Sequence, residues 1–259
     1  MSIGEQLGSV GQQVAKYMQK SGLMLATVTN INDPDTLGRI KCKPVSEDED
    51  VAETDWCFCL SPAGGKEYGC FFFPNVDDLV VLAFLNGDVH HPLVIGHYWA
   101  NETVAPYKIE GGKNEISSIK TPKGVEIKLV DTDKKEKLLL TTPSGAFVQI
   151  DDEAKSISFQ DKEADNAFTL NWEKGEAELK VKKKITMDAG GKASLTMESS
   201  GAITIEATDT LTLKGKDVNI TANSNFEAEG MSAKVKANGM LTLQASGTAQ
   251  LKGATVKIN

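Results

Sequence analysis

Apolar and polar residues follow two different patterns along this chain. Between residues 23 and 107, short apolar stretches such as MLATVTNI and DLVVLAFL are followed by the turn-forming stretches NDPDTLGR and NGD. Short strands punctuated by Gly, Asn, Asp and Pro are typical of small closed all-β structures. We therefore predict five or six strands over residues 23–107, arranged as a small β-barrel.

Beyond residue 120, two apolar residues separated by one polar residue recur at short intervals. The segment TPKGVEIKLVD is echoed by TPSGAFVQIDD 21 residues later. From residue 201 the apolar pairs follow one another at steps of 7 or 8 residues. The pairs are Leu138/Leu140, Val148/Ile150, Ile157/Phe159, Phe168/Leu170, Leu179/Val181, Ile185/Met187, Leu195/Met197, Ile203/Ile205, Leu211/Leu213, Val218/Ile220, Phe226/Ala228, Ala233/Val235, Leu241/Leu243, Ala249/Leu251 and Val256/Ile258. A fixed short period indicates a repeat architecture.

Each unit of this repeat directs two side chains to one face of a strand and one to the other. The gaps between pairs are too short for a crossover helix, so tight corners must join the strands. Three arrangements fit this pattern: a β-helix made by one chain, three chains wound around one axis, or a plain antiparallel meander. The meander would leave long exposed edges, which favour aggregation.

Residues 1–22 have a helical rather than a strand-like pattern. Apolar residues recur three or four positions apart within residues 3–20, and Ser21-Gly22 ends the pattern. The residues on this face include Ile3, Leu7, Val10, Val14 and Tyr17. Three glycines lower the intrinsic helix propensity, so the predicted amphipathic helix needs a surface to lie on. That surface is either its own domain or a docking partner.

Composition excludes several classes of protein. The formal net charge is −8, which disfavours nonspecific nucleic-acid binding. Hydrophobic residues make up 40 %, enough for a packed core, and no apolar run is long enough to span a bilayer. The N-terminal residues do not have the pattern of a secretory signal, so we expect synthesis in the cytoplasm and four cysteines that remain thiols.

The eight prolines divide the chain, since none lies after Pro143. A strand ladder needs nearly every backbone N–H, which proline lacks. Together with the change of rhythm, this predicts a barrel domain over 23–107, a linker over 108–120 and a repeat shaft over 121–259. The shaft divides into a wider part, 121–200, and a regular part, 201–259.

The candidate chemical groups favour structural roles over catalytic ones. Adjacent histidines on a strand point to opposite faces, so His90 and His91 do not readily share a metal ion. Cys57 and Cys59 share one face but lack the spacing of a zinc knuckle, and we expect buried thiols. The acidic run 47–50 is typical of a solvated loop, and the aromatic run 71–73 is assigned to core packing. No catalytic residue, cofactor site or metal site is predicted.

The order of several segments resembles the spike proteins of contractile injection machines, namely the phage baseplate assembly protein V group and the VgrG proteins of type VI secretion. The resemblance covers residues 23–259. It is carried by DPDTLGRIKCKP, PNVDDLVVLAFLNGDVHHPLVIGHYW and TPSGAFVQIDD, followed by the repeats. It implies an all-β chain in which an oligonucleotide/oligosaccharide-binding (OB) barrel precedes a homotrimeric, intertwined β-helix needle.

The resemblance also implies partners. A barrel trimer would sit on a baseplate hub protein, and the needle would carry a PAAR-type tip protein and pierce the target envelope. Val256, Lys257, Ile258 and Asn259 would dock the tip protein, and the N-terminal helix could dock the hub. No hub region or lysozyme-like insertion is recognisable, so we expect a separate hub and no peptidoglycan cleavage by this chain. The alternatives are a single-chain β-helix that binds or cleaves carbohydrate, and the stalk of a trimeric fibre or adhesin.

Overall fold

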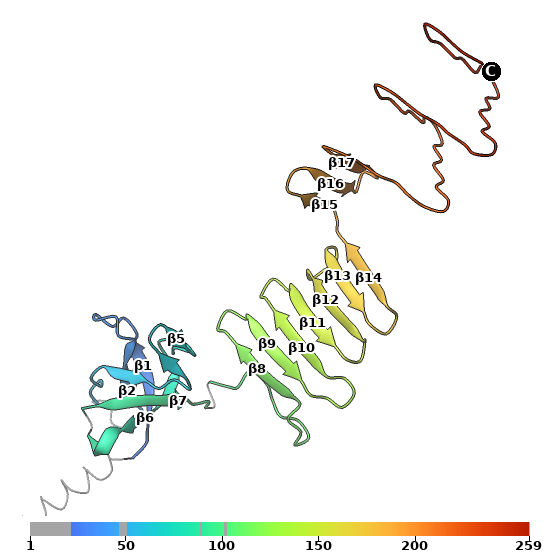
Figure 1. The fold of residues 1–259 in the computed structure, drawn as a ribbon. Coiled ribbons are helices and arrows are strands. Elements are labelled where there is room, and N and C mark those ends of the chain that lie inside the picture. Colours follow the sequence, from blue (N-terminus) through green and yellow to red (C-terminus); the bar gives the residue numbers. More distant parts are fainter. Residues whose placement is uncertain (1–21, 47–50, 89, 101–102, 259) are drawn as a thin grey trace, which may run out of the picture. The chain divides into compact units, whose positions relative to one another are not determined.

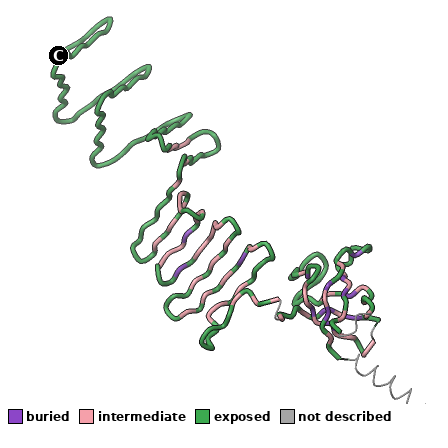
Figure 2. The backbone as a smooth tube through the Cα atoms, turned by 180° about the vertical axis from the view of Figure 1, so that it is seen from behind, coloured by how far each residue is buried: buried purple, intermediate pink, exposed green. Residues whose placement is uncertain are grey.

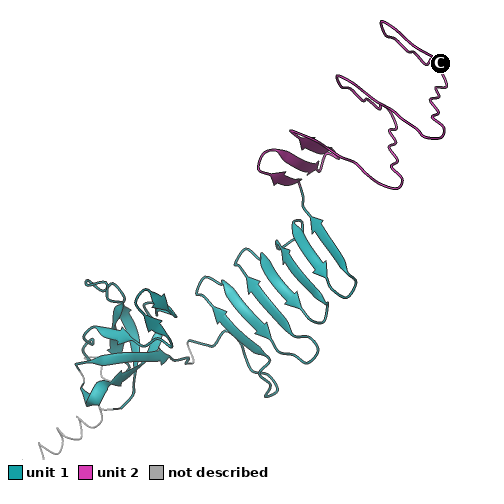
Figure 3. Cartoon of the chain, in the orientation of Figure 1, with its two compact units in different colours: residues 1–182 teal, residues 183–259 magenta. Residues whose placement is uncertain are grey.

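The computed structural model describes residues 22–46, 51–88, 90–100 and 103–258, and β-strands are the main elements within them (Figure 1). The single helical element among these residues is a short 3-10 turn, Leu85–Gly87. The chain divides into two compact units, Met1–Lys182 and Lys183–Asn259 (Figure 3). The predicted N-terminal helix lies almost entirely outside the described residues. Within these residues, no helix has the length and hydropathy needed to cross a bilayer.

The first part of unit 1 is a closed barrel with the strand order β1-β2-β3-β7-β6. The strands are β1 Met24–Asn30, β2 Arg39–Pro44, β3 Cys57–Cys59, β6 Leu79–Phe84 and β7 Pro92–His97. Pairing of β1 with β6 closes the barrel, and β3 with β7 is its parallel pair. This confirms the prediction of a five- or six-stranded barrel.

The barrel core follows from alternation along these strands. The fully buried side chains include Val28, Ile40, Val80 and Leu82, each from a strand in which buried residues alternate with more exposed ones. Most buried segments of the chain lie in the barrel (Figure 2). Cys57 is also fully buried, and Cys59 packs against the same core. The two cysteines therefore share one face as predicted, and all four cysteines are free thiols. The expectation of buried thiols holds for Cys42 and Cys57 and is wrong for Cys70, which is exposed in the irregular segment after β5.

The aromatic run at 71–73 does not behave as predicted. Phe71 is 83 % exposed and Phe72 is 64 % exposed, while Phe73 packs against the barrel core. The run follows the small hairpin of β4 (Gly64–Gly65) and β5 (Tyr68–Gly69) and is not itself a strand. Assigning the whole run to the core was wrong, because irregular backbone turns one ring inward and leaves the others outside.

The remainder of unit 1 is a seven-stranded antiparallel sheet in which each strand pairs with the next in sequence. Its strands are β8 Ile116–Lys120, β9 Glu126–Val130, β10 Lys137–Thr141, β11 Phe147–Asp151, β12 Ser156–Gln160, β13 Ala167–Asn171 and β14 Glu176–Lys180. The apolar pairs predicted from residue 138 to residue 170 each lie within one of these strands. From β8 to β14 the chain thus forms an antiparallel meander, one of the three arrangements considered for the repeat.

The echoed TP-x-G segments form the same turn twice. Gly124 N donates to Thr121 O and Thr121 N donates to Val125 O, each at 2.9 Å. Gly145 N donates to Thr142 O in the same way at 2.9 Å. Gly124 and Gly145 have φ values of 88° and 87°, a region that glycine enters without steric cost. The sequence echo therefore encodes two hairpin turns, between β8 and β9 and between β10 and β11.

Unit 2 begins with a three-stranded antiparallel sheet, β15 Lys184–Ala189, β16 Ala193–Glu198 and β17 Ile203–Ala207. From residue 208 to residue 258, none of the described residues belongs to a strand, although this is the most regular part of the repeat. Within 209–258 no backbone–backbone hydrogen bond is present. The repeat thus has strand-like composition, but this single chain offers it no strand partner.

Candidate functional site

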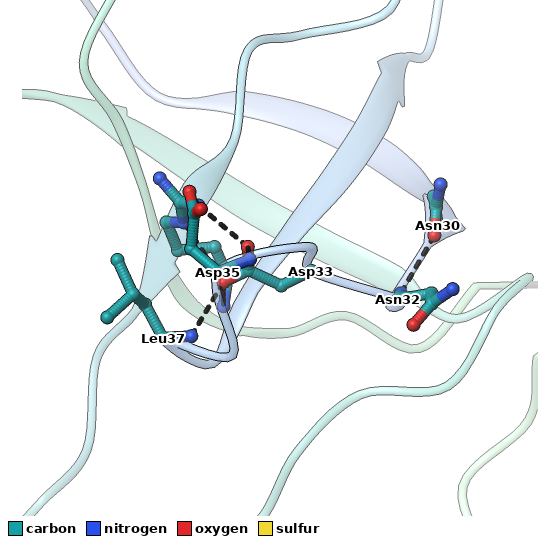
Figure 4. A network of polar contacts seen from close by, with 6 residues as sticks. Asn30, Asn32, Asp33, Asp35 and Leu37 are labelled. Atoms are coloured by element: carbon teal, nitrogen blue, oxygen red, sulfur yellow. Dashed lines mark hydrogen bonds and ion pairs between the residues drawn. The ribbon is translucent and has the colours of Figure 1, made fainter.

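The turn between β1 and β2 is organised around the carboxylate of Asp33 (Figure 4). Its oxygens accept backbone N–H groups from Asp35 at 3.1 Å, Leu37 at 2.9 Å and Arg39 at 3.2 Å. The Arg39 guanidinium adds two further hydrogen bonds, from Nε at 3.0 Å and from a terminal nitrogen at 2.6 Å. Asp33 is only 8 % exposed. The DPDTLGR segment is therefore a preorganised turn whose acid and base stabilise each other.

Hydrogen bonding from Arg39 is the main cause that lowers the pKa of Asp33 well below its usual range. Because the folded-state pKa is depressed, the carboxylate stabilises the barrel fully above about pH 4 and loses this effect as the pH falls toward the folded value. We expect the barrel to keep its stability from pH 7 to about pH 5 and to lose it progressively below about pH 4.

Amide hydrogen exchange of β1 and β2 across this pH range measures the effect, after correction for intrinsic exchange rates. The variant Asp33→Asn should be less stable at neutral pH and should show a smaller further loss in acid. Asp77→Asn is the matched control, since Asp77 is an exposed turn residue with a positive φ that asparagine also tolerates. Equal acid responses of the wild type and Asp33→Asn would contradict the assignment.

The outer face of β2 and β3 combines cations with aromatic rings. The Arg39 guanidinium lies 5.8 Å from the Trp56 ring centre and 5.9 Å from the Phe58 ring centre, and Lys41 Nζ lies 5.5 Å from the Trp56 ring centre. The sequence pattern missed this proximity, because Trp56 and Arg39 are distant in sequence. Lys41 pairs with Glu53 at 3.1 Å, and Arg39 pairs with Asp33 and Asp35. Carboxylates therefore offset both cations on this face.

The histidines pair with carboxylates at the barrel surface. His91 Nδ1 lies 2.8 Å from Asp88 Oδ2, while His90 and His97 each lie 3.8 Å from an aspartate oxygen, of Asp55 and Asp78 respectively. The three imidazole rings pair with three different carboxylates. Among the described residues, no group of three or more His, Cys, Asp or Glu side chains is arranged to hold a metal ion.

One face of the seven-stranded sheet carries two continuous apolar rows. Cross-strand register places side chains directly opposite one another from β8 to β14. The first row is Leu129, Leu138, Ile150, Ile157, Leu170 and Ala177, with the polar residue Ser117 at its β8 end, and the second is Ile119, Ile127, Leu140, Val148, Phe159, Phe168 and Leu179. We call these residues the apolar face. They are partly exposed, as shown by Leu140 at 41 % and Phe159 at 49 %.

The three-stranded sheet of unit 2 has two apolar rows of its own. Leu195 stands between Met187 and Ile205, and Met197 stands between Ile185 and Ile203. Met187 and Ile203 are 61 % and 67 % exposed. Apolar rows of this length without a covering layer are unusual for a monomer, because sheets bury their apolar face against another element.

The opposite face of the seven-stranded sheet is mostly polar, although Val130, Leu139 and Phe147 also lie on it, and some of its polar side chains pair with one another. Lys137 Nζ lies 2.7 Å from Asp151 Oδ2 on the neighbouring strand, and Gln149 Nε2 donates to the same oxygen at 2.7 Å. Burial alone would raise the pKa of Asp151, but the hydrogen bond from Lys137 and the backbone N–H of Ala154 outweigh it and lower the pKa. This face is therefore suited to solvent, whereas the apolar face is not.

The segment after the barrel is attached to this polar face. Tyr107 Oη donates a hydrogen bond to Glu126 Oε1 at 2.5 Å, and Glu126 is only 7 % exposed. Burial and this hydrogen bond raise the pKa of Tyr107 to about 12. The Lys120 and Lys128 ammonium groups lie 5.9 Å and 5.5 Å from the Tyr107 ring centre. Sequence analysis missed this contact, because Tyr107 ends the predicted barrel domain and Glu126 lies in the predicted shaft, 19 residues further along the chain.

The predicted docking residues are described only in part. Ile3, Leu7, Val10, Val14 and Tyr17 lie outside the described residues, and so does Asn259. Val256 and Ile258 are 52 % and 85 % exposed, and Lys257 is exposed as well. These side chains are thus accessible in the single chain, and their role in docking remains a prediction.

Comparison with known proteins identifies the barrel. Residues 24–99 match the family described as the type VI secretion system/phage-baseplate injector OB domain. The matched residues begin at β1 and end two residues after β7, so they span the five barrel strands. No curated protein matches the chain. The barrel over residues 24–99, with its closed five-stranded topology, is thus similar to the OB domains of phage-baseplate and type VI secretion injectors.

Proposed function

We propose that this chain is the structural central spike of a contractile injection machine, and that it works as a homotrimer. In this proposal the barrels sit on a baseplate hub, and three copies of residues 121–259 wind around one axis as a β-helical needle. The observation that carries the proposal is the apolar face, whose two rows run across seven strands without a covering layer. Three such faces turned inward would enclose one continuous apolar core.

Burial supplies the driving force for this assembly. Each fully buried Leu, Ile or Phe side chain contributes about 1.5–3 kcal/mol relative to exposure in water. Side chains of the apolar face are already partly covered by their neighbours, so each gains a fraction of that amount. Repeated over two rows and three chains, this gain favours a permanent assembly over a transient contact.

The backbone after Ala207 favours three intertwined chains over three chains that fold separately and then pack side by side. Buried N–H and C=O groups need partners, and within residues 209–258 the chain supplies none to itself. Its apolar residues, such as Leu213 at 67 % and Leu243 at 81 %, are also exposed. Strands from two other copies, placed between successive strands of this one, would satisfy the backbone and cover the side chains together.

The proposed function is mechanical. A narrow rod in which every strand is hydrogen-bonded on both sides has no lateral edge and resists bending and peeling. Such a rod can be driven through a cell envelope by a contracting sheath without chemistry of its own. This role would place the protein in the baseplate of a phage or an injection particle, with transient contact to the target membrane.

The proposed partners occupy the two ends of the spike. The N-terminal residues Ile3, Leu7, Val10, Val14 and Tyr17 would contact the hub, and Val256, Lys257, Ile258 and Asn259 would form the platform for a PAAR-type tip protein. Copurification of a tip protein with the full chain, and its loss on deletion of residues 256–259, tests the second contact. A tip protein that binds equally well after the deletion would refute this docking site.

Native mass measurement of the full chain tests the spike itself. The expected species is a trimer of about 83 kDa, three times the 27.8 kDa of one chain, that persists on dilution. A stable monomer would refute the proposal and favour a single-chain carbohydrate-binding or lyase protein. A trimer that binds neither a hub nor a tip protein would favour the stalk of a fibre or adhesin.

A further inference from the structure

Charge is distributed unevenly between the last repeats and the rest of the chain. Residues 230–259 contain four lysines and no aspartate or glutamate, whereas the other residues contain 24 Lys and Arg against 36 Asp and Glu. The lysines are Lys234, Lys236, Lys252 and Lys257. The last repeats therefore carry +4, and the remainder of the chain carries −12.

These lysines occupy the polar positions of the repeat. Lys257 stands between the apolar residues Val256 and Ile258, and Lys252 follows directly after Leu251. In a strand, successive side chains point to opposite faces, so the lysines face away from the apolar side. All four are exposed in the single chain. In the proposed trimer they would lie on the outer surface of the rod.

Acidic neighbours distinguish the four lysines from one another. Glu227 and Glu229 precede Lys234 and Lys236 by one repeat of seven residues, so in a ladder each of these lysines faces a carboxylate one strand away. Lys252 and Lys257 have no such neighbour, because the equivalent positions of the two preceding repeats hold Thr242, Gln244 and Gln250. In a symmetric trimer, neighbours at the same level come from the same residues of the other copies. None of them supplies a carboxylate.

We propose that three copies of Lys252 and Lys257 form a basic collar that binds the anionic, phosphate-bearing surface of the target membrane as the spike arrives. Lys257 lies at the level of the proposed tip platform, but its side chain would stand on the outer wall of the rod, so a tip protein seated on the end of the rod would leave this side chain exposed. The inference rests on the proposed trimer, which converts two lysines into six on a narrow rod. Lysine is a compact point charge that suits a diffuse layer of phosphates. Residues 230–259 contain no aromatic residue on which a nucleic-acid base could stack, which favours a membrane over a nucleic acid.

The acidic remainder of the chain would orient the spike at the membrane. An anionic surface repels the part of the chain that carries −12 and attracts the part that carries +4. The spike would therefore approach the membrane with its last repeats leading. Raising the ionic strength shortens the distance over which this attraction and this repulsion act. The contact with the membrane should therefore weaken as the ionic strength rises.

Cosedimentation of the full chain with lipid vesicles tests the collar. Vesicles of phosphatidylcholine alone are compared with vesicles that also contain phosphatidylglycerol, at low and high ionic strength. The wild-type trimer should bind the anionic vesicles at low ionic strength and should leave them at high ionic strength. Each lysine that reaches an anionic surface contributes about fivefold in affinity, so K252Q/K257Q should bind at least about 25-fold more weakly.

The matched control is K214Q/K216Q, which also removes two positive charges per chain. These lysines lie earlier in the repeat region, near Asp209 and Asp217. The control variant should keep its affinity within about twofold. Equal binding to neutral and anionic vesicles, or equal losses in the two variants, would overturn the proposal. Native mass is measured on every variant. A monomeric wild type would refute the spike itself, whereas a trimer that ignores anionic vesicles would refute only the collar.

Discussion

Replacing Leu140 by aspartate is expected to prevent trimer formation. Leu140 lies in the middle of the second apolar row, opposite Ile127 on one neighbouring strand and Val148 on the other. In the proposed trimer, three carboxylates would meet in a closed apolar core without hydrogen-bond partners. Burial of a charge under such conditions costs several kcal/mol per chain. The expected outcome is a monomer, or an aggregate of exposed apolar faces, in place of the trimer.

The adjacent residue of the same strand provides the control. Leu139 faces the polar side, where Lys128 and Gln149 are its cross-strand neighbours. Leu139→Asp should leave the trimer intact in a native mass measurement, because its carboxylate would lie on the mostly polar face beside Lys128 and outside the apolar core. If both variants remain trimeric, or if both dissociate, the apolar face is not the surface that joins the chains.

Replacing Leu82 by alanine is expected to destabilise the barrel by about 2–5 kcal/mol. Leu82 is a large side chain with no exposed surface, and it belongs to the core that also contains Val28, Ile40 and Val80. Removal of its terminal carbons leaves a cavity that a small closed barrel cannot readily fill. Amide hydrogen exchange of β1 and β6 reports the loss as faster exchange, without requiring the whole chain to unfold in one step.

Leu85 is the matched control for this change. It lies three residues further along the chain, in the turn after β6, and is 56 % exposed. Leu85→Ala should change the exchange rates of β1 and β6 little. A Leu82→Ala barrel as well protected as the Leu85→Ala barrel would contradict the assignment of the core.

Local patterns predicted the strands of unit 1 well, because alternation and turn residues act within a few positions. The apolar pairs such as Val148/Ile150 and Phe159 with Ile157 each lie in one strand, and the TP-x-G echo marks two equivalent turns. The aromatic run at 71–73 was assigned wrongly, since composition does not reveal which rings an irregular segment directs outward. Contacts between distant positions, such as Tyr107 with Glu126, were not predicted at all.

The structure of the regular repeat differs from its prediction for another physical reason. The period of seven or eight residues after residue 201 predicts strands, yet none forms among the described residues beyond Ala207. A strand is stable only when a neighbour satisfies its hydrogen bonds. Here the sequence specifies which residues can form strands, and in the proposed trimer the other two copies would supply the neighbouring strands.

By itself, the sequence determined the all-β class, the barrel before the repeat, and the alternation that separates apolar from polar positions. These properties follow from local chemistry: strand-forming residues, turn-forming residues and a period of two. Only the tertiary structure decided how the strands pair. Pairing aligned the separate apolar residues of seven strands into two continuous rows, and it brought Arg39 between Asp33 and Trp56. Register is a relation between distant segments, and no local pattern contains it.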